Sequence, residues 1–141
     1  MSKLYVAYGS NLNLKLMMDR CKSAKVLGIG LIKDYRLTFR KFLDIEKCDG
    51  YTVPVGVFEI FEQDEIELDI YEEYPVLYRK EEVEVQMQDK VVTAMAYIMN
   101  DTKYIMPTQI YLDKIIQGYK DFNFDIKYVD EALNYTKKML N

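Results

Sequence analysis

Histidine and tryptophan are absent from this chain of 141 residues. Without an imidazole there can be no Ser-His-Asp or Cys-His catalysis, no histidine-ligated zinc and no histidine general base. Any acid–base chemistry must therefore fall to carboxylates, Lys, Tyr or Cys. The sequence carries 23 Asp and Glu residues and 13 tyrosines, so candidates of both kinds are plentiful.

Cysteine is also scarce, and positively charged residues are outnumbered by negatively charged ones. Cys21 and Cys48 form no CxxC pair and are too few for a disulfide framework, which indicates a reducing compartment. We find no targeting segment and no apolar run long enough to cross a bilayer, so we expect a cytoplasmic protein without membrane contact. The net charge of −4 argues against a nucleic-acid partner, which would require a basic surface. A small molecule or another protein is the expected partner.

The length suits one domain, which we expect to span residues 1–141. A strand-like run at 4–8 is followed by a helical i, i+3, i+4, i+7 pattern that begins at Leu14 and ends at Cys21. Further strands are predicted at 26–32, 35–39 and 53–57, a hairpin around Asp89 and Lys90, and helices that begin at Pro107 and cover 129–140. Strands joined by short turns, with short helices beside them, predict an α+β fold built on a small, mostly antiparallel sheet or barrel.

Three local patterns refine this prediction. The polar residues 44–50 predict a loop or a hairpin turn, and Pro54 indicates that its strand is an edge or is bent. Asp64 and Glu67 have the spacing of a capping box. The short helix that they open should end before Pro75, because the residue before a proline disfavours the helical conformation. Glu72 is thereby expected at the end of that helix.

The first candidate for chemistry is Tyr8-Gly9-Ser10-Asn11, between a strand and a helix. Glycine allows a ligand to approach the backbone closely, and free N–H groups at a helix start favour an anionic group. The alternative is structural: Gly9 makes the turn and Asn11 caps the helix. A short motif of this kind does not decide between the two.

The second candidate is the acidic and aromatic segment 68–79, which contains Glu72. Tyrosines around a carboxylate can exclude water and raise its pKa toward the range of a general base. The alternative is a solvated acidic helix end. Most of the 13 tyrosines are expected to be half-buried strand residues, with a few lining a polar pocket.

Several segments occur in an order typical of one family. They are YVAYGSNL at 5–12, the strands at 31–39 and 56–60, Leu68-Asp69 followed by Glu72, and Tyr97 followed by the segment from Pro107 to Tyr111. This combination resembles the γ-glutamylcyclotransferase-like family, which includes the AIG2-like proteins. The resemblance covers nearly the whole chain and implies a small mixed β-barrel with flanking short helices.

The resemblance also implies a reaction and a set of site residues. The α-amine of a γ-glutamyl group attacks its own side-chain amide carbonyl, which yields 5-oxoproline and a free amine or amino acid without a cofactor or a metal. Glu72 would be the catalytic base. The substrate-binding residues would be Tyr8, Gly9, Ser10, Asn11, Leu12, Tyr78, Tyr97 and Tyr111.

One residue departs from the family pattern. Glu73 stands where the family commonly has glycine after the catalytic glutamate. A β-carbon and a charge there could narrow the pocket, alter the turn into Pro75 or raise the pKa of Glu72 by repulsion. The departure supports an alternative function, a non-catalytic module that keeps the fold and binds a small ligand or a protein.

Overall fold

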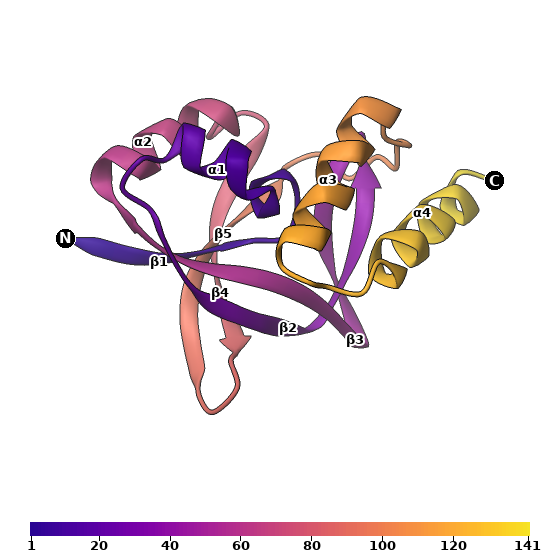
Figure 1. Cartoon of the computed structure of the whole chain (residues 1–141). Coiled ribbons are helices and arrows are strands. Elements are labelled where there is room, and N and C mark those ends of the chain that lie inside the picture. Colours follow the sequence, from indigo (N-terminus) through magenta and orange to yellow (C-terminus); the bar gives the residue numbers. More distant parts are fainter.

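The computed structural model describes residues 1–141, and its centre is a closed β-barrel of five strands (Figure 1). The strands are β1 (Ser2–Ala7), β2 (Lys25–Arg40), β3 (Phe42–Phe61), β4 (Tyr78–Gln86) and β5 (Val91–Met99). They follow the order β1-β3-β2-β4-β5 around the barrel, and β1 closes it by pairing in parallel with β5. The other pairs are antiparallel. The mixed, mostly antiparallel barrel predicted from the sequence is therefore confirmed.

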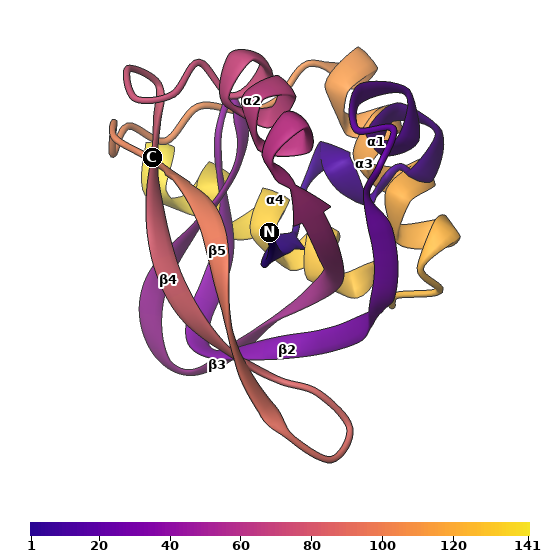
Figure 2. The same ribbon diagram turned by 90° about the vertical axis from the view of Figure 1, so that its left-hand side faces the viewer.

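Four α-helices flank the barrel. They are α1 (Leu14–Arg20), α2 (Glu62–Tyr71), α3 (Gln109–Asp121) and α4 (Lys127–Leu140), and a 3₁₀ turn, η1 (Ser10–Leu12), precedes α1. Figure 2 shows α1, α2 and α3 near one end of the barrel, while the connection between β4 and β5 lies at the other. Helix α4 packs against β2. None of these helices combines the length and the apolar character that crossing a bilayer requires.

The two longest strands, β2 and β3, form one hairpin that turns at Lys41, where φ is 71°. Residues 44–50 lie inside β3, so the predicted loop at this stretch is wrong. The polarity of Asp44 and Glu46 has a tertiary cause, because both form ion pairs with Arg40, at 2.8 and 2.9 Å. Pattern alone does not reveal such a pairing across a turn.

Pro54 occupies a stretch of β3 with one neighbouring strand. Strand β1 ends opposite Gly56, so β3 has partners on both sides from Gly56 to Glu59 and only β2 beside Pro54. A proline is tolerated there because its missing N–H removes no ladder bond on the free side. The predicted edge character is confirmed at this point of the strand.

Two helix starts differ slightly from the predicted positions. Helix α2 begins at Glu62, and its N-cap is Phe61. Asp64, the third residue of the helix, caps it because its Oδ2 accepts a hydrogen bond from the Phe61 N–H at 2.9 Å. Helix α3 has Thr108 as its N-cap, so Pro107 lies just before the helix instead of inside it. The end of α2 just before Glu72 agrees with the prediction.

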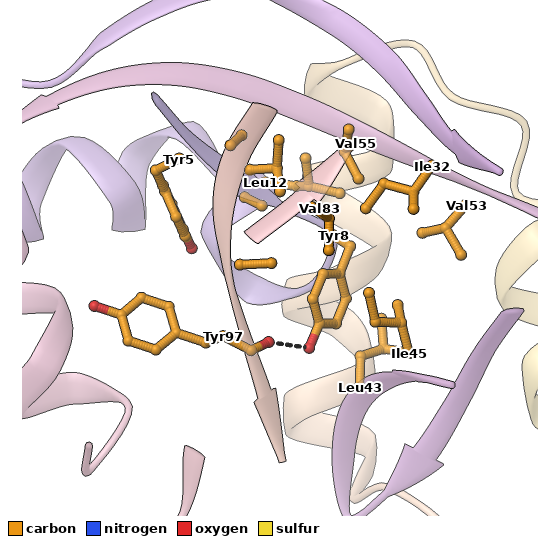
Figure 3. Close-up of a cluster of buried hydrophobic side chains, with 14 of the residues drawn as sticks. Tyr5, Tyr8, Leu12, Ile32, Leu43, Ile45, Val53, Val55, Val83 and Tyr97 are labelled. Carbon is orange, nitrogen blue, oxygen red and sulfur yellow. Dashed lines mark hydrogen bonds between the residues drawn. The ribbon is translucent and has the colours of Figure 1, made fainter. Parts of the chain in front are cut away.

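The approach of α3 to η1 fixes the segment that leads into α1. A Cβ on Gly118 would lie 2.7 Å from the Asn13 nitrogen and 2.8 Å from the Leu12 carbonyl carbon, so this crossing requires glycine. Leu12 is fully buried at the same contact. The core that supports it fills the barrel and includes Ile32, Leu43, Ile45, Val53, Val55 and Val83 (Figure 3).

Candidate active site

A cavity of about 210 Å³ is lined by residues from β1, η1, the start of β3, the end of α2, β4, β5 and α3. Every residue that the sequence predicted for the site lines this cavity, with the exception of Leu12. They are Tyr8, Gly9, Ser10, Asn11, Glu72, Tyr78, Tyr97 and Tyr111. Leu12 instead packs in the core beside Gly118, because η1 turns its side chain away from the cavity.

Glu72 directly follows the last residue of α2 and is only 9% exposed. Its carboxylate has no hydrogen-bond or ion-pair partner within the protein. Burial raises the pKa of Glu72 to about 7, although the Arg20 guanidinium acts in the opposite direction. A carboxylate with such a pKa is suited to accept and return a proton near neutral pH.

Glu73 lies at the rim of the same cavity but is exposed. Its φ of 52° is in the left-handed region, which glycine enters without cost and residues with a β-carbon rarely adopt. The shift of the Glu72 pKa comes from burial and not from repulsion by Glu73, so that expectation is wrong. The two adjacent carboxylates therefore occupy different environments, and only Glu72 is desolvated.

The loop of residues 9–11 presents three successive backbone N–H groups, none of which donates to an acceptor in the protein. The side chains of Ser10 and Asn11 are buried. Asn11 does not cap α1, because Asn13 does so by accepting a hydrogen bond from the Leu16 N–H at 3.2 Å. The purely structural interpretation of Asn11 as a helix cap is therefore wrong.

Hydrogen bonds fix several of the cavity tyrosines. The Tyr8 hydroxyl donates to the Tyr97 carbonyl oxygen at 2.7 Å, and the Tyr97 ring extends to the other side of β5 (Figure 3). The Tyr97 hydroxyl donates to Asp69 at 2.6 Å, while the Tyr111 hydroxyl accepts from the Leu43 N–H at 2.9 Å. These three phenols are thus held in place.

Tyr78 differs from those three because its hydroxyl makes no hydrogen bond within the protein. Its ring is buried and contacts the Tyr97 ring edge-on, with the centroids 6.5 Å apart. Burial raises the pKa of Tyr78 far above its ordinary value, so the phenol stays protonated. It remains available as a hydrogen-bond donor to a molecule in the cavity.

Sequence reasoning missed part of the lining. The additional residues are Tyr5, Val6, Phe42, Leu43, Tyr71 and Leu77, and Glu73, which the sequence suggested only as a residue that could narrow the pocket, also lines it. Tyr71 and Glu73 flank Glu72, so their proximity was available as a signal. Phe42 and Leu43 gave none, because the turn at Lys41 that brings them to the cavity was not predicted. No group of three Cys, Asp or Glu side chains converges in a way that could hold a metal ion.

Comparisons with known proteins agree with this architecture. The family model described as "Gamma-glutamyl cyclotransferase, AIG2-like" matches residues 5–116. A solved structure of a γ-glutamyl cyclotransferase is 25% identical with a TM-score of 0.82, over 94% of this chain and 86% of that one. An uncharacterized protein from Homo sapiens is 26% identical with a TM-score of 0.81, over 93% and 86% of the two chains.

A more distant structure, an AIG2-like protein from Mus musculus, is 19% identical with a TM-score of 0.62, over 79% of this chain and 82% of that one. At this identity the likeness concerns the fold alone. No curated protein sequence matches the chain significantly.

Proposed function

The chain belongs to the γ-glutamyl cyclotransferase, AIG2-like family, and we propose that it cyclises the γ-glutamyl group of a γ-glutamyl amine or dipeptide to 5-oxoproline. One observation carries the proposal: a buried carboxylate without a partner, Glu72, shares a cavity with three free backbone N–H groups. The Glu72 carboxylate could accept a proton from the substrate's ammonium group, and the N–H groups could bind the substrate's α-carboxylate.

The proposed reaction balances without a cofactor or water. Glu72 takes a proton from the α-ammonium, and the freed amine nitrogen attacks the δ-carbonyl carbon to close a five-membered ring. The oxyanion that forms needs a nearby donor, for which the free Tyr78 hydroxyl is suited. Protonated Glu72 then returns the proton to the departing nitrogen as the amide bond breaks. The ring nitrogen gives up its second proton by way of Glu72 to the free amine, which leaves as an ammonium. Holding both reacting groups in one cavity supplies much of the acceleration.

The leaving group is expected to be an amine without a carboxylate. The charged residues that line the cavity, Glu72 and Glu73, are both acidic, and no Lys or Arg lines it. The carboxylate of a departing amino acid would meet repulsion and no counter-ion. We therefore expect kcat/KM for γ-glutamyl-butylamine or γ-glutamyl-benzylamine to exceed that for γ-glutamyl-alanine by about tenfold or more, since each tenfold step needs only about 1.4 kcal/mol.

Mass spectrometry of 5-oxoproline in incubations with purified protein tests this preference and the proposed function together. A preference for the dipeptide would contradict the expected leaving group but would leave the proposed cyclisation standing. Release from no member of a broad panel, combined with measurable binding, would instead favour the non-catalytic module, whose fold is retained without the activity.

The rate should depend on pH through Glu72. A general base must be ionised before it can accept a proton, so kcat/KM is expected to rise with pH and to level off above the pKa of about 7. A profile measured between about pH 5 and pH 9 should have its half-maximal point near that value. A half-maximal point near the ordinary glutamate pKa would mean that the base is a solvated carboxylate and not Glu72.

A further inference from the structure

Arg20, the last residue of α1, contacts both segments that carry the proposed machinery. Its guanidinium carbon lies 3.4 Å from the centroid of the Tyr71 ring, and Tyr71 is the residue before Glu72. Its Nη1 donates a hydrogen bond to the side-chain oxygen of Asn11, in the loop of residues 9–11. One side chain thus joins the loop to the end of α2.

Further hydrogen bonds extend this junction. The Asn11 amide donates to the Tyr5 hydroxyl at 2.9 Å, and the Ser10 and Tyr71 hydroxyls are also 2.9 Å apart. The loop and the end of α2 are therefore connected directly as well as through Arg20. Tyr5 anchors the assembly to the barrel wall, because it is a buried residue of β1.

Arg20 is also the positive charge that acts on Glu72. The other ionisable groups that face Glu72 are phenols from the elements around it: Tyr5 of β1, Tyr8, Tyr78 of β4 and Tyr111 of α3. Burial raises the pKa of each of these phenols well above its ordinary value, so they carry no charge near neutral pH. Glu73 and Tyr71 are the chain neighbours of Glu72, and both are exposed at the cavity rim.

We propose that Arg20 is a positioning residue: its guanidinium, stacked on the ring that precedes Glu72 and bonded to Asn11, clamps the loop of residues 9–11 to the end of α2 and places a positive charge at this end of the helix. The catalytic consequence rests on the proposed function, whereas the structural and electrostatic consequences do not. The clamp needs an arginine, because a planar guanidinium can stack on Tyr71 while one of its N–H groups reaches Asn11. A lysine in its place would keep the charge and lose the stacked geometry.

The electrostatic task is tested by carbon-13 NMR titration of the Glu72 carboxyl, assigned by its loss in Glu72→Gln. In Arg20→Gln the titration midpoint should move up by about one pH unit, because the ionised carboxylate loses its favourable charge. Arg20→Lys should keep the midpoint within a few tenths of a unit. Lys22→Gln removes the same charge from an exposed position two residues away and should leave the midpoint unchanged. A folded Arg20→Gln with an unchanged midpoint overturns the proposal.

The clamp is tested separately by hydrogen exchange in Arg20→Lys. This measurement keeps the proposal testable even if Arg20→Gln does not fold. The Leu12 and Asn13 amides are hydrogen-bonded to the Gly9 and Ser10 carbonyl oxygens at 3.0 Å, so their hydrogen exchange reports on the loop. Exchange should become several-fold faster in Arg20→Lys and not in Lys22→Gln. Unchanged exchange in Arg20→Lys contradicts the clamp.

Kinetics then connect Arg20 to the proposed reaction. The pH profile of Arg20→Gln should shift upward in parallel with the NMR midpoint, and KM should rise in Arg20→Lys while its profile stays in place. If the wild-type protein releases no 5-oxoproline, the proposed function is refuted. The NMR titration and the exchange rates still decide whether Arg20 has the role proposed for it.

Discussion

Replacing Glu72 with Gln is expected to lower the rate of 5-oxoproline release by about 10² to 10⁴-fold, the contribution typical of a general base. Gln has nearly the same size and still fits a cavity site that is 9% exposed, but it cannot accept the ammonium proton. The loss should appear mainly in kcat, because the proton transfer occurs in the transition state. Release is measured by mass spectrometry at a pH above 7.

Two variants of neighbouring acids serve as comparisons for Glu72→Gln. Glu62→Gln changes an exposed residue of the same helix that does not line the cavity, and turnover should be unaffected. Glu73→Gln removes the adjacent carboxylate. If Glu73→Gln loses activity by this factor while Glu72→Gln retains it, Glu73 and not Glu72 carries the proton, and the assignment of the base is wrong.

Measurements of the free energy of unfolding distinguish loss of the catalytic base from loss of the fold in Glu72→Gln. The pKa of Glu72 is raised in the folded protein to about 7 from an ordinary value of 4.5, so the folded state binds the proton more tightly than the unfolded state. Stability of the parent should fall as the pH rises from about 4.5 to about 7 and remain lower above that. At pH 8 the Gln variant is expected to be more stable, by up to about 3 kcal/mol, with no gain below the ordinary glutamate pKa.

Replacing Asp44 with Ala is expected to lower the free energy of unfolding by about 3 to 5 kcal/mol. Asp44 and Arg40 are both nearly inaccessible, and their ion pair measures 2.8 Å. Asp44 also accepts the Met99 N–H at 3.0 Å, which ties β3 to the end of β5. The substitution leaves a buried guanidinium without this counter-ion and a backbone N–H without an acceptor, both of which are costly. Chemical denaturation monitored by circular dichroism measures the loss.

The matched control for Asp44→Ala is Glu81→Ala. Glu81 pairs with Arg79 in β4, and both side chains are more than a third exposed. Such surface pairs contribute about 0 to 1 kcal/mol, because water already solvates the two charges. Equal and small losses in the two variants would mean that the Arg40–Asp44 pair is not the buried link that the structure indicates.

Much of the site could be predicted because its residues lie next to signals in the sequence. Gly9, Ser10 and Asn11 follow an apolar strand and precede a periodic helix, so their position at a strand-to-helix connection is evident from pattern. The approximate position of Glu72 follows from Pro75, which limits the preceding helix. Burial of Glu72 could not be read from the same pattern, since it depends on tyrosines from β1, β4 and α3 that surround it.

The remaining errors arise where a distant contact overrides local preference. Residues 44–50 are polar enough for a loop, yet Arg40 neutralises Asp44 and Glu46 and allows the strand to continue. Arg20 carries no signal in the sequence beyond its place near a helix end. Its importance emerges only when α1 and α2 pack together and bring Tyr71 beneath the guanidinium. The conformation of Glu73 is likewise set by the turn that follows α2.

The most direct test of the account is a crystal structure of Glu72→Gln with an intact γ-glutamyl amine bound. We expect the glutamyl group in the cavity, with its α-amine within hydrogen-bond distance of the Gln side chain at position 72 and its carboxylate at the N–H groups of residues 9–11. A substrate that binds outside this cavity, or that turns its α-amine away from position 72, would contradict the central claim that Glu72 is the proton carrier of a histidine-free site.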